Sequence, residues 1–188
     1  MKRTTLRVQL IRGFLIIMVS MALFLFYENY YAMKVVREEV SLSTSRALAI
    51  HVAQVDRTLE EVSRDLLRQR LNGDVNADFL ALARYPYTHG EYVYAKVRIQ
   101  AALVESDSGF EHIHSFFAYV SHYDDFIFSQ ISYSQTERLR SLLGTFFRDG
   151  EHRKTNGWQV YRYENASYLI KADRALNGSS LYLGAVVR

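Results

Sequence analysis

The sequence predicts an α+β protein: an N-terminal transmembrane helix that runs into a long helix, then a five-stranded antiparallel sheet flanked by helices. Three observations predict this. No residue from Gly13 to Tyr27 is charged, and neither Gly nor Pro occurs from Glu28 to Leu71. After His114, short aromatic runs separated by turn residues replace the helical periodicity. The expected organisation is a tail over 1–9, a span over 10–31 and a folded domain over 32–188.

The span over 10–31 has the length and composition of a membrane anchor. Its Phe, Leu, Ile and Val side chains favour insertion by about 3–5 kcal/mol. As a helix it covers about 33 Å, enough for a hydrocarbon core of about 30 Å. Tyr27, Tyr30 and Tyr31 would lie at the membrane interface. The alternative is a cleaved signal peptide, but the apolar run Leu23–Phe26 directly follows the small residues Ser20 and Ala22.

The charge distribution predicts how the span is oriented in the membrane and argues against a nucleic-acid partner. The net charge is +3, and four basic residues precede the first acidic one: Lys2, Arg3, Arg7 and Arg12. They predict a cytoplasmic N-terminus, and therefore a cell-membrane protein that crosses once and carries its C-terminal domain outside the cell. The rest of the chain has a net charge of −1 (+3 less these 4), so we expect no nucleic-acid partner.

The long helix over 32–71 carries an apolar stripe with steps of three and four residues: Leu48, Val52, Val55, Leu59, Val62 and Leu66. Two interpretations stay open. The stripe is one side of the domain's own core, or it is the seam of a parallel homodimer. The turn residues Asn72-Gly73-Asp74 predict the end of this helix.

Helices within 76–105 follow, and then strands and one helix within 114–188. The two predicted helices are Phe79–Arg84 and Glu91–Glu105. The later helix carries a capping-box pair, Ser134 with Glu137, ahead of its apolar stripe. The predicted strands are His114–Ser121, Phe126–Ile131, Trp158–Tyr163, Tyr168–Ala172 and Leu181–Val187. This order, two strands, a helix and three strands, is that of a PAS-like sheet.

The chain resembles the N-terminal sensor region of membrane histidine kinases that pair with AraC-type response regulators. The segments that carry the likeness are Asn29–Ala32, Val35–Val40, Gln54–Leu59, Tyr168–Lys171 and Tyr182–Val187. The resemblance implies a Cache/PAS-like ectodomain that senses a ligand and relays the signal through its long helix in a two-component system. A second apolar run, a Gly-rich nucleotide lid and an Asn-box segment do not occur in the sequence. We therefore expect a sensor fragment without the kinase core, and no enzyme activity.

Aromatic and cationic residues concentrate on two adjoining predicted strands. The candidate ligand-binding residues are Trp158, Tyr161, Arg162, Tyr168 and Lys171. The alternative is that the rings fill the core and the charges face water, and strand alternation places Trp158 and Arg162 on the face opposite Tyr161.

The sequence contains no pattern that predicts a metal site, a cofactor site or a catalytic nucleophile. His112 and His114 share a strand face, but this spacing alone does not predict a metal site, and the sequence suggests no cofactor. The absence of Cys excludes a thiolate site or nucleophile, and no Gly-x-Ser-x-Gly elbow occurs. The expected partners are the lipid bilayer, a small-molecule or envelope-derived ligand, and a second copy of the chain. The alternative function is a membrane-anchored cell-surface binding or assembly domain with no small-molecule ligand.

Overall fold

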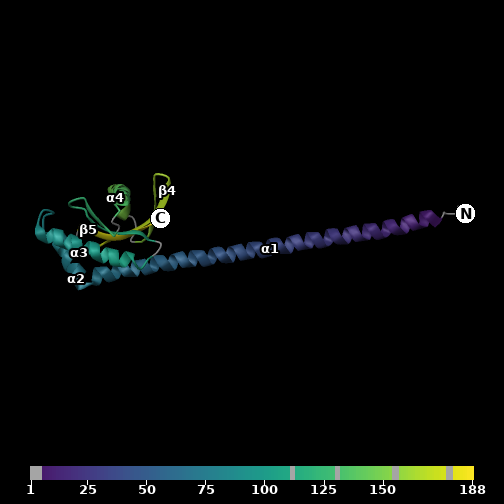
Figure 1. Ribbon diagram of the computed structural model, residues 1–188, viewed down its shortest axis with the longest axis horizontal. Helices are drawn as coiled ribbons and strands as arrows, with labels where there is room; N and C mark the ends of the chain where they lie inside the picture. Colours follow the sequence, from purple (N-terminus) through teal and green to yellow (C-terminus); the bar gives the residue numbers. More distant parts are fainter. Residues whose placement is uncertain (1–5, 111–112, 130–131, 154–156, 177–179) are drawn as a thin grey trace. The chain divides into compact units, whose positions relative to one another are not determined.

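The computed structural model describes residues 6–110, 113–129, 132–153, 157–176 and 180–188. The chain divides into two compact units, Met1–Asp56 and Arg57–Arg188. Helix α1 (Leu6–Leu71) contributes to both (Figure 1). Helix α1 continues without interruption past residue 31, the predicted end of the span.

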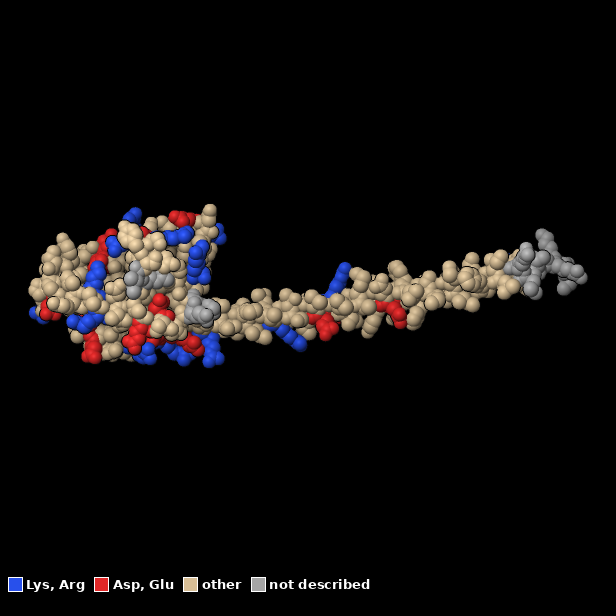
Figure 2. Space-filling view, viewed as in Figure 1, with Lys and Arg blue, Asp and Glu red and all other residues tan. Residues whose placement is uncertain are grey.

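The first unit consists of the N-terminal part of α1. This helix is long and apolar enough near its N-terminus to cross a membrane, and none of its apolar window is buried. Large apolar side chains such as Phe14, Ile17 and Phe24 are at least 60% exposed. On the face seen in Figure 2, the first part of α1 shows only uncharged side chains. These features make it a candidate membrane span. Lys2 and Arg3, two of the four basic residues on which the predicted orientation depends, lie outside the described residues.

The second unit is the predicted α+β domain. After α1 come α2 (Gly73–Arg84), α3 (Gly90–Asp107), β1 (Ile113–Val120), β2 (Asp125–Phe128), α4 (Tyr133–Arg148), the short 3-10 helix η1 (Glu151–Arg153), β3 (Gln159–Tyr163), β4 (Ala166–Arg174) and β5 (Leu181–Val187). The five strands form one sheet in the order β2-β1-β5-β4-β3, and every neighbouring pair is antiparallel. A long helix followed by a five-stranded antiparallel sheet with flanking helices is confirmed.

Both faces of the sheet are covered, so the unit has two apolar cores. Helices α1, α2 and α3 cover one face and α4 covers the other (Figure 1). The first core joins Val62, Phe79 and Ile99 to alternate residues of the central strands, such as Phe116. The second joins the stripe of α4 to the intervening residues, such as Phe117. Because both faces are buried, β1 and β5 are apolar along nearly their whole length.

Several element boundaries differ from those the sequence predicts. Helix α1 ends at Leu71, as the turn residues Asn72-Gly73-Asp74 predict. Asn72 also caps α2: its Oδ1 accepts a hydrogen bond from the Asp74 backbone N–H at 3.2 Å, and α2 begins at Gly73 and not near residue 76. The capping-box assignment was also wrong, because the N-cap of α4 is Ser132. Strand β2 ends at Phe128, before the predicted Ile131, which lies outside the described residues. Strand β4 is longer than predicted.

The apolar stripe of the long helix is divided between two environments. Val62 and Leu66 are 0% and 1% exposed in the first core. Leu48, Val52 and Val55 are 64%, 52% and 51% exposed. The core interpretation therefore holds for the C-terminal part of the stripe, while the N-terminal part is uncovered within the chain.

Candidate functional site

The hairpin of β3 and β4 does not gather the five candidate ligand residues into one site. Tyr161 and Tyr168 are direct cross-strand partners and pack in the second core, under α4. Trp158 packs against the first core, and Lys171 pairs with Ala185, a member of that core. Arg162 is exposed. The sheet therefore separates the two tyrosines from the other three residues, as the alternation along β3 indicates.

Each of the partly buried candidates already has a partner within the fold. The Tyr161 hydroxyl donates to Asp149 Oδ2 at 2.8 Å, and its ring meets Phe146 edge-on at 5.4 Å. Tyr168 is 3% exposed in the core. Lys171 Nζ lies 3.7 Å from Asp173 Oδ2, and its side chain is 13% exposed. These contacts are structural, and the binding role of the five residues stays a prediction.

Trp158 joins the C-terminal part of α1 to the sheet. Its indole N–H is 3.1 Å from both the Leu59 carbonyl oxygen and Ser63 Oγ. We expect Trp158→Phe to lower the free energy of unfolding by at least about 1 kcal/mol, because the hydrogen bond is lost and the smaller phenyl ring fills less of the space beside the first core. Urea denaturation followed by circular dichroism measures this. Tyr133→Phe, at a ring that is 81% exposed, is the control. Equal stability of the Trp158 variant and the wild type would contradict the anchoring role.

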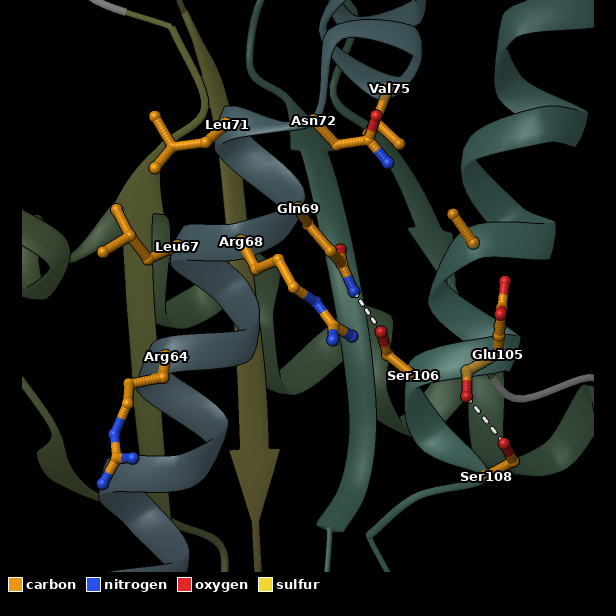
Figure 3. Close-up of a pocket in the computed structure, with 11 residues that line it drawn as sticks. Arg64, Leu67, Arg68, Gln69, Leu71, Asn72, Val75, Glu105, Ser106 and Ser108 are labelled. Atoms are coloured by element: carbon orange, nitrogen blue, oxygen red, sulfur yellow. Dashed lines mark hydrogen bonds between the residues drawn. The ribbon is translucent and has the colours of Figure 1, made fainter.

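An open groove of about 960 Å³ lies between the end of α1, the start of α2 and the end of α3. Figure 3 shows Gln69 reaching from α1 toward Ser106 of α3, and the two side chains are hydrogen bonded. Gln69 and Arg68 both donate to Asp65, which is 9% exposed. The bond between Gln69 and Ser106 therefore joins α1 to α3, whereas the two bonds to Asp65 lie within α1.

A smaller cleft of about 490 Å³ lies beside the turn between β1 and β2. Three tyrosine rings contribute to its wall. The Tyr123 ring centroid is 5.8 Å from those of both Tyr87 and Tyr92, and the contact with Tyr92 is edge-to-face. Lys96 of α3 and Arg140 of α4 line it as well, together with the turn residues Asp124 and Asp125. We call this the tyrosine cleft.

The charges of the tyrosine cleft fall into two groups. Asp125 is compensated, because both of its oxygens accept from Lys96 Nζ, at 2.8 and 2.7 Å, and Oδ2 accepts from the Tyr92 hydroxyl at 2.9 Å. Burial, followed by the charge of Asp125, raises the pKa of Tyr92, which keeps this hydroxyl a donor. Asp124 has a φ of 51°, and among the described residues its carboxylate accepts from the Tyr119 hydroxyl alone, at 3.0 Å on Oδ1. Within the described residues, no ion pair joins Asp124 to Arg140.

Tyr119 makes the stability of the fold sensitive to alkaline pH. Burial, and then its hydrogen bond to Asp124, raise its pKa to about 12. Since the folded pKa lies above the unfolded value of about 10, the neutral ring stabilises the fold fully below pH ~10, and this contribution is lost as the pH approaches 12. We expect Tyr119→Phe to lose less stability than the wild type between these pH values in urea titrations. A parallel decline in both proteins would contradict this.

The predicted histidine pair does not form a described metal site. His112 lies outside the described residues, and His114 of β1 has its ring centroid 6.5 Å from that of Tyr168. Burial lowers the pKa of His114. In the part of the chain that the structure describes, no group of three or more His, Asp or Glu residues could hold a metal ion.

The tyrosine cleft could not be predicted from the sequence because its residues come from three separate regions. Tyr87 precedes α3, Tyr123 lies in a turn and Arg140 lies on α4. The sequence predicts the strands His114–Ser121 and Phe126–Ile131 on either side of this turn, but no site in the turn itself. Comparison of the chain with protein-family models, with curated proteins and with solved structures found no match.

Proposed function

We propose that the chain is the membrane-anchored, extracytoplasmic ligand-sensing module of a two-component histidine kinase. The observation that carries this proposal is the composition of α1 along its length. The helix begins with an apolar, exposed stretch suited to a bilayer and ends with Val62 and Leu66 buried in the core of the sheet domain. A displacement of the domain's core could therefore be transmitted along one uninterrupted helix.

The sheet domain adds further support. Its order of two strands, a helix and three strands in one antiparallel sheet is the order that a PAS-like or Cache-like sensor domain has. The segments of the family resemblance, Tyr168–Lys171 and Tyr182–Val187, lie on the neighbouring strands β4 and β5. Trp158 ties α1 to the same sheet.

Membrane topology tests the anchoring and the orientation. We propose that an epitope placed after Arg188 is degraded when intact cells are treated with a protease, whereas an epitope placed before Lys2 is protected. Lysed cells, in which both epitopes should be degraded, are the control. Protection of the C-terminal epitope in intact cells would overturn the extracytoplasmic location of the domain.

A parallel homodimer through the exposed part of the stripe is the second element of the proposal. Leu48, Val52 and Val55 continue the spacing of the buried residues but are not covered. We expect Val52→Glu with Val55→Glu to abolish cross-linking of the full chain in detergent. The matched control is Ile50→Glu, which adds a charge at a residue that is 67% exposed and outside the stripe. Loss of cross-linking in the control as well, or a monomeric wild type, would contradict a specific seam.

A cell-surface assembly domain without a small-molecule ligand is the alternative function. One observation favours it: Val93, Tyr94 and Val97 of α3 are 49%, 65% and 59% exposed, which is an apolar surface. The two functions differ in what the gene encodes after Arg188. A following return span and kinase core would support the sensor, and a stop codon in an intact gene would support assembly.

A further inference from the structure

The tyrosine cleft combines the features of a small-molecule site. Its volume of about 490 Å³ is in the range of ligand pockets, and its wall is aromatic with a few polar groups. It lies beside the β1–β2 turn, and its lining comes from α3, from the turn and from α4. It is therefore separate from the β3–β4 hairpin.

Two charges of opposite sign remain available in the cleft. Asp125 and Lys96 neutralise each other, and Tyr92 uses its hydroxyl on the same carboxylate. Asp124 Oδ1 accepts from Tyr119, and no described group donates to Oδ2. Arg140 has no described hydrogen bond or ion pair. The carboxylate and the guanidinium line the same cleft without meeting, so each can accept a charged group of a ligand.

The aromatic wall suits the part of a ligand that carries the positive charge. A cation is attracted to the face of a tyrosine ring, and the attraction adds to that of a nearby carboxylate. Tyr87 and Tyr123 lie with Asp124 on the lining of the cleft. A guanidinium binds a carboxylate in a two-point contact, which makes Arg140 the complementary anchor for the negative end.

We propose that the tyrosine cleft binds a small zwitterion, with its ammonium group at Asp124 and the tyrosine rings and its carboxylate at Arg140. The cleft supplies one uncompensated charge of each sign, so a ligand with both charges completes both contacts, whereas a ligand with one charge leaves the other anchor unused. This inference deepens the proposed sensing function by giving the chemical class of its ligand.

Titration calorimetry of the full chain in detergent micelles tests the proposal. The probes are glycine, β-alanine, γ-aminobutyrate and ε-aminocaproate, which differ in the separation of their charges. The single-charge analogues are n-butylamine and butyrate. We expect at least one zwitterion to bind, and both single-charge analogues to bind about tenfold or more weakly, since each loses one charged contact. Failure of every zwitterion to bind at millimolar concentration would overturn the proposal.

Two substitutions assign the anchors. Asp124→Asn removes the charge but keeps an acceptor for Tyr119 and tolerates the left-handed backbone at φ 51°. Arg140→Gln removes the other charge. Each should weaken the best zwitterion by about tenfold. The matched control is Arg138→Gln, whose guanidinium lies 3.4 Å from Glu164 Oε2, outside the cleft. Unchanged affinity in both cleft variants, or equal loss in the control, would overturn the assignment.

The outcomes separate this inference from the proposed function. Zwitterion binding that depends on Asp124 and Arg140, combined with a protected C-terminal epitope in intact cells, would support the cleft and reject the extracytoplasmic sensor. The predicted topology without zwitterion binding would leave the anchored module in place and reject the ligand class.

Discussion

Gly184→Ala is expected to destabilise the sheet domain by about 3 kcal/mol or more. Gly184 lies in β5, between Phe117 of β1 and Ala172 of β4. A Cβ atom at this position would lie 2.5 and 2.8 Å from Phe117 ring atoms and would also collide with the Lys171 carbonyl oxygen. Because β5 is hydrogen bonded on both sides, its backbone cannot move away without disturbing a neighbouring strand.

Gly144→Ala is the matched control for this effect. Gly144 lies within α4, and a Cβ atom there would meet no atom within 4 Å. Alanine should stabilise this helix by about 0.5–1 kcal/mol, because glycine loses more backbone entropy on folding. Thermal or urea unfolding of the full chain in detergent measures both variants. Equal stability of the Gly184→Ala and Gly144→Ala variants would show that the neighbours of Gly184 leave room for a Cβ atom.

If the candidate span of α1 anchors the chain as proposed, Leu15→Asp with Val19→Asp will release the chain from the membrane. An aspartate near the centre of a span costs about 2.5–3.5 kcal/mol, so the pair costs about 5–7 kcal/mol. This exceeds the gain of about 3–5 kcal/mol from the apolar side chains of the span. Both positions are exposed along α1, at 60% and 51%, so no packing within the chain accounts for the loss.

Membrane fractionation followed by alkaline extraction measures this release. The control is Ser41→Asp with Ser45→Asp, which adds the same charge to exposed positions of the same helix outside 10–31. We expect the control to remain in the membrane fraction. Retention of the Leu15 and Val19 double variant in that fraction after extraction would contradict anchoring by this stretch.

The sequence alone was enough to predict most of the local structure. Strand β5 has the predicted bounds, Leu181–Val187, because its continuous apolar run can only be buried on both faces of a sheet. The apolar stripe predicted behind Ser134 and Glu137 consists of Leu139, Leu142, Leu143 and Phe146, and all four are buried. Alternation along β3 correctly separated Trp158 from Tyr161. These features follow from periods of 2.0 and 3.6 residues, which are properties of the chain itself.

Tertiary structure decided which segments cover the apolar faces of α1 and of the sheet. The stripe of α1 has one spacing from Leu48 to Leu66, but only contacts with α2, α3 and the sheet bury its second half. Trp158 meets Leu59, a residue 99 positions away, and the tyrosine cleft joins Tyr87 to Arg140. Periodicity specifies which side chains share a face, but it holds no information on the distant segment that packs there. The two cores, the contact of Trp158 with α1 and the candidate ligand site therefore depend on long-range packing.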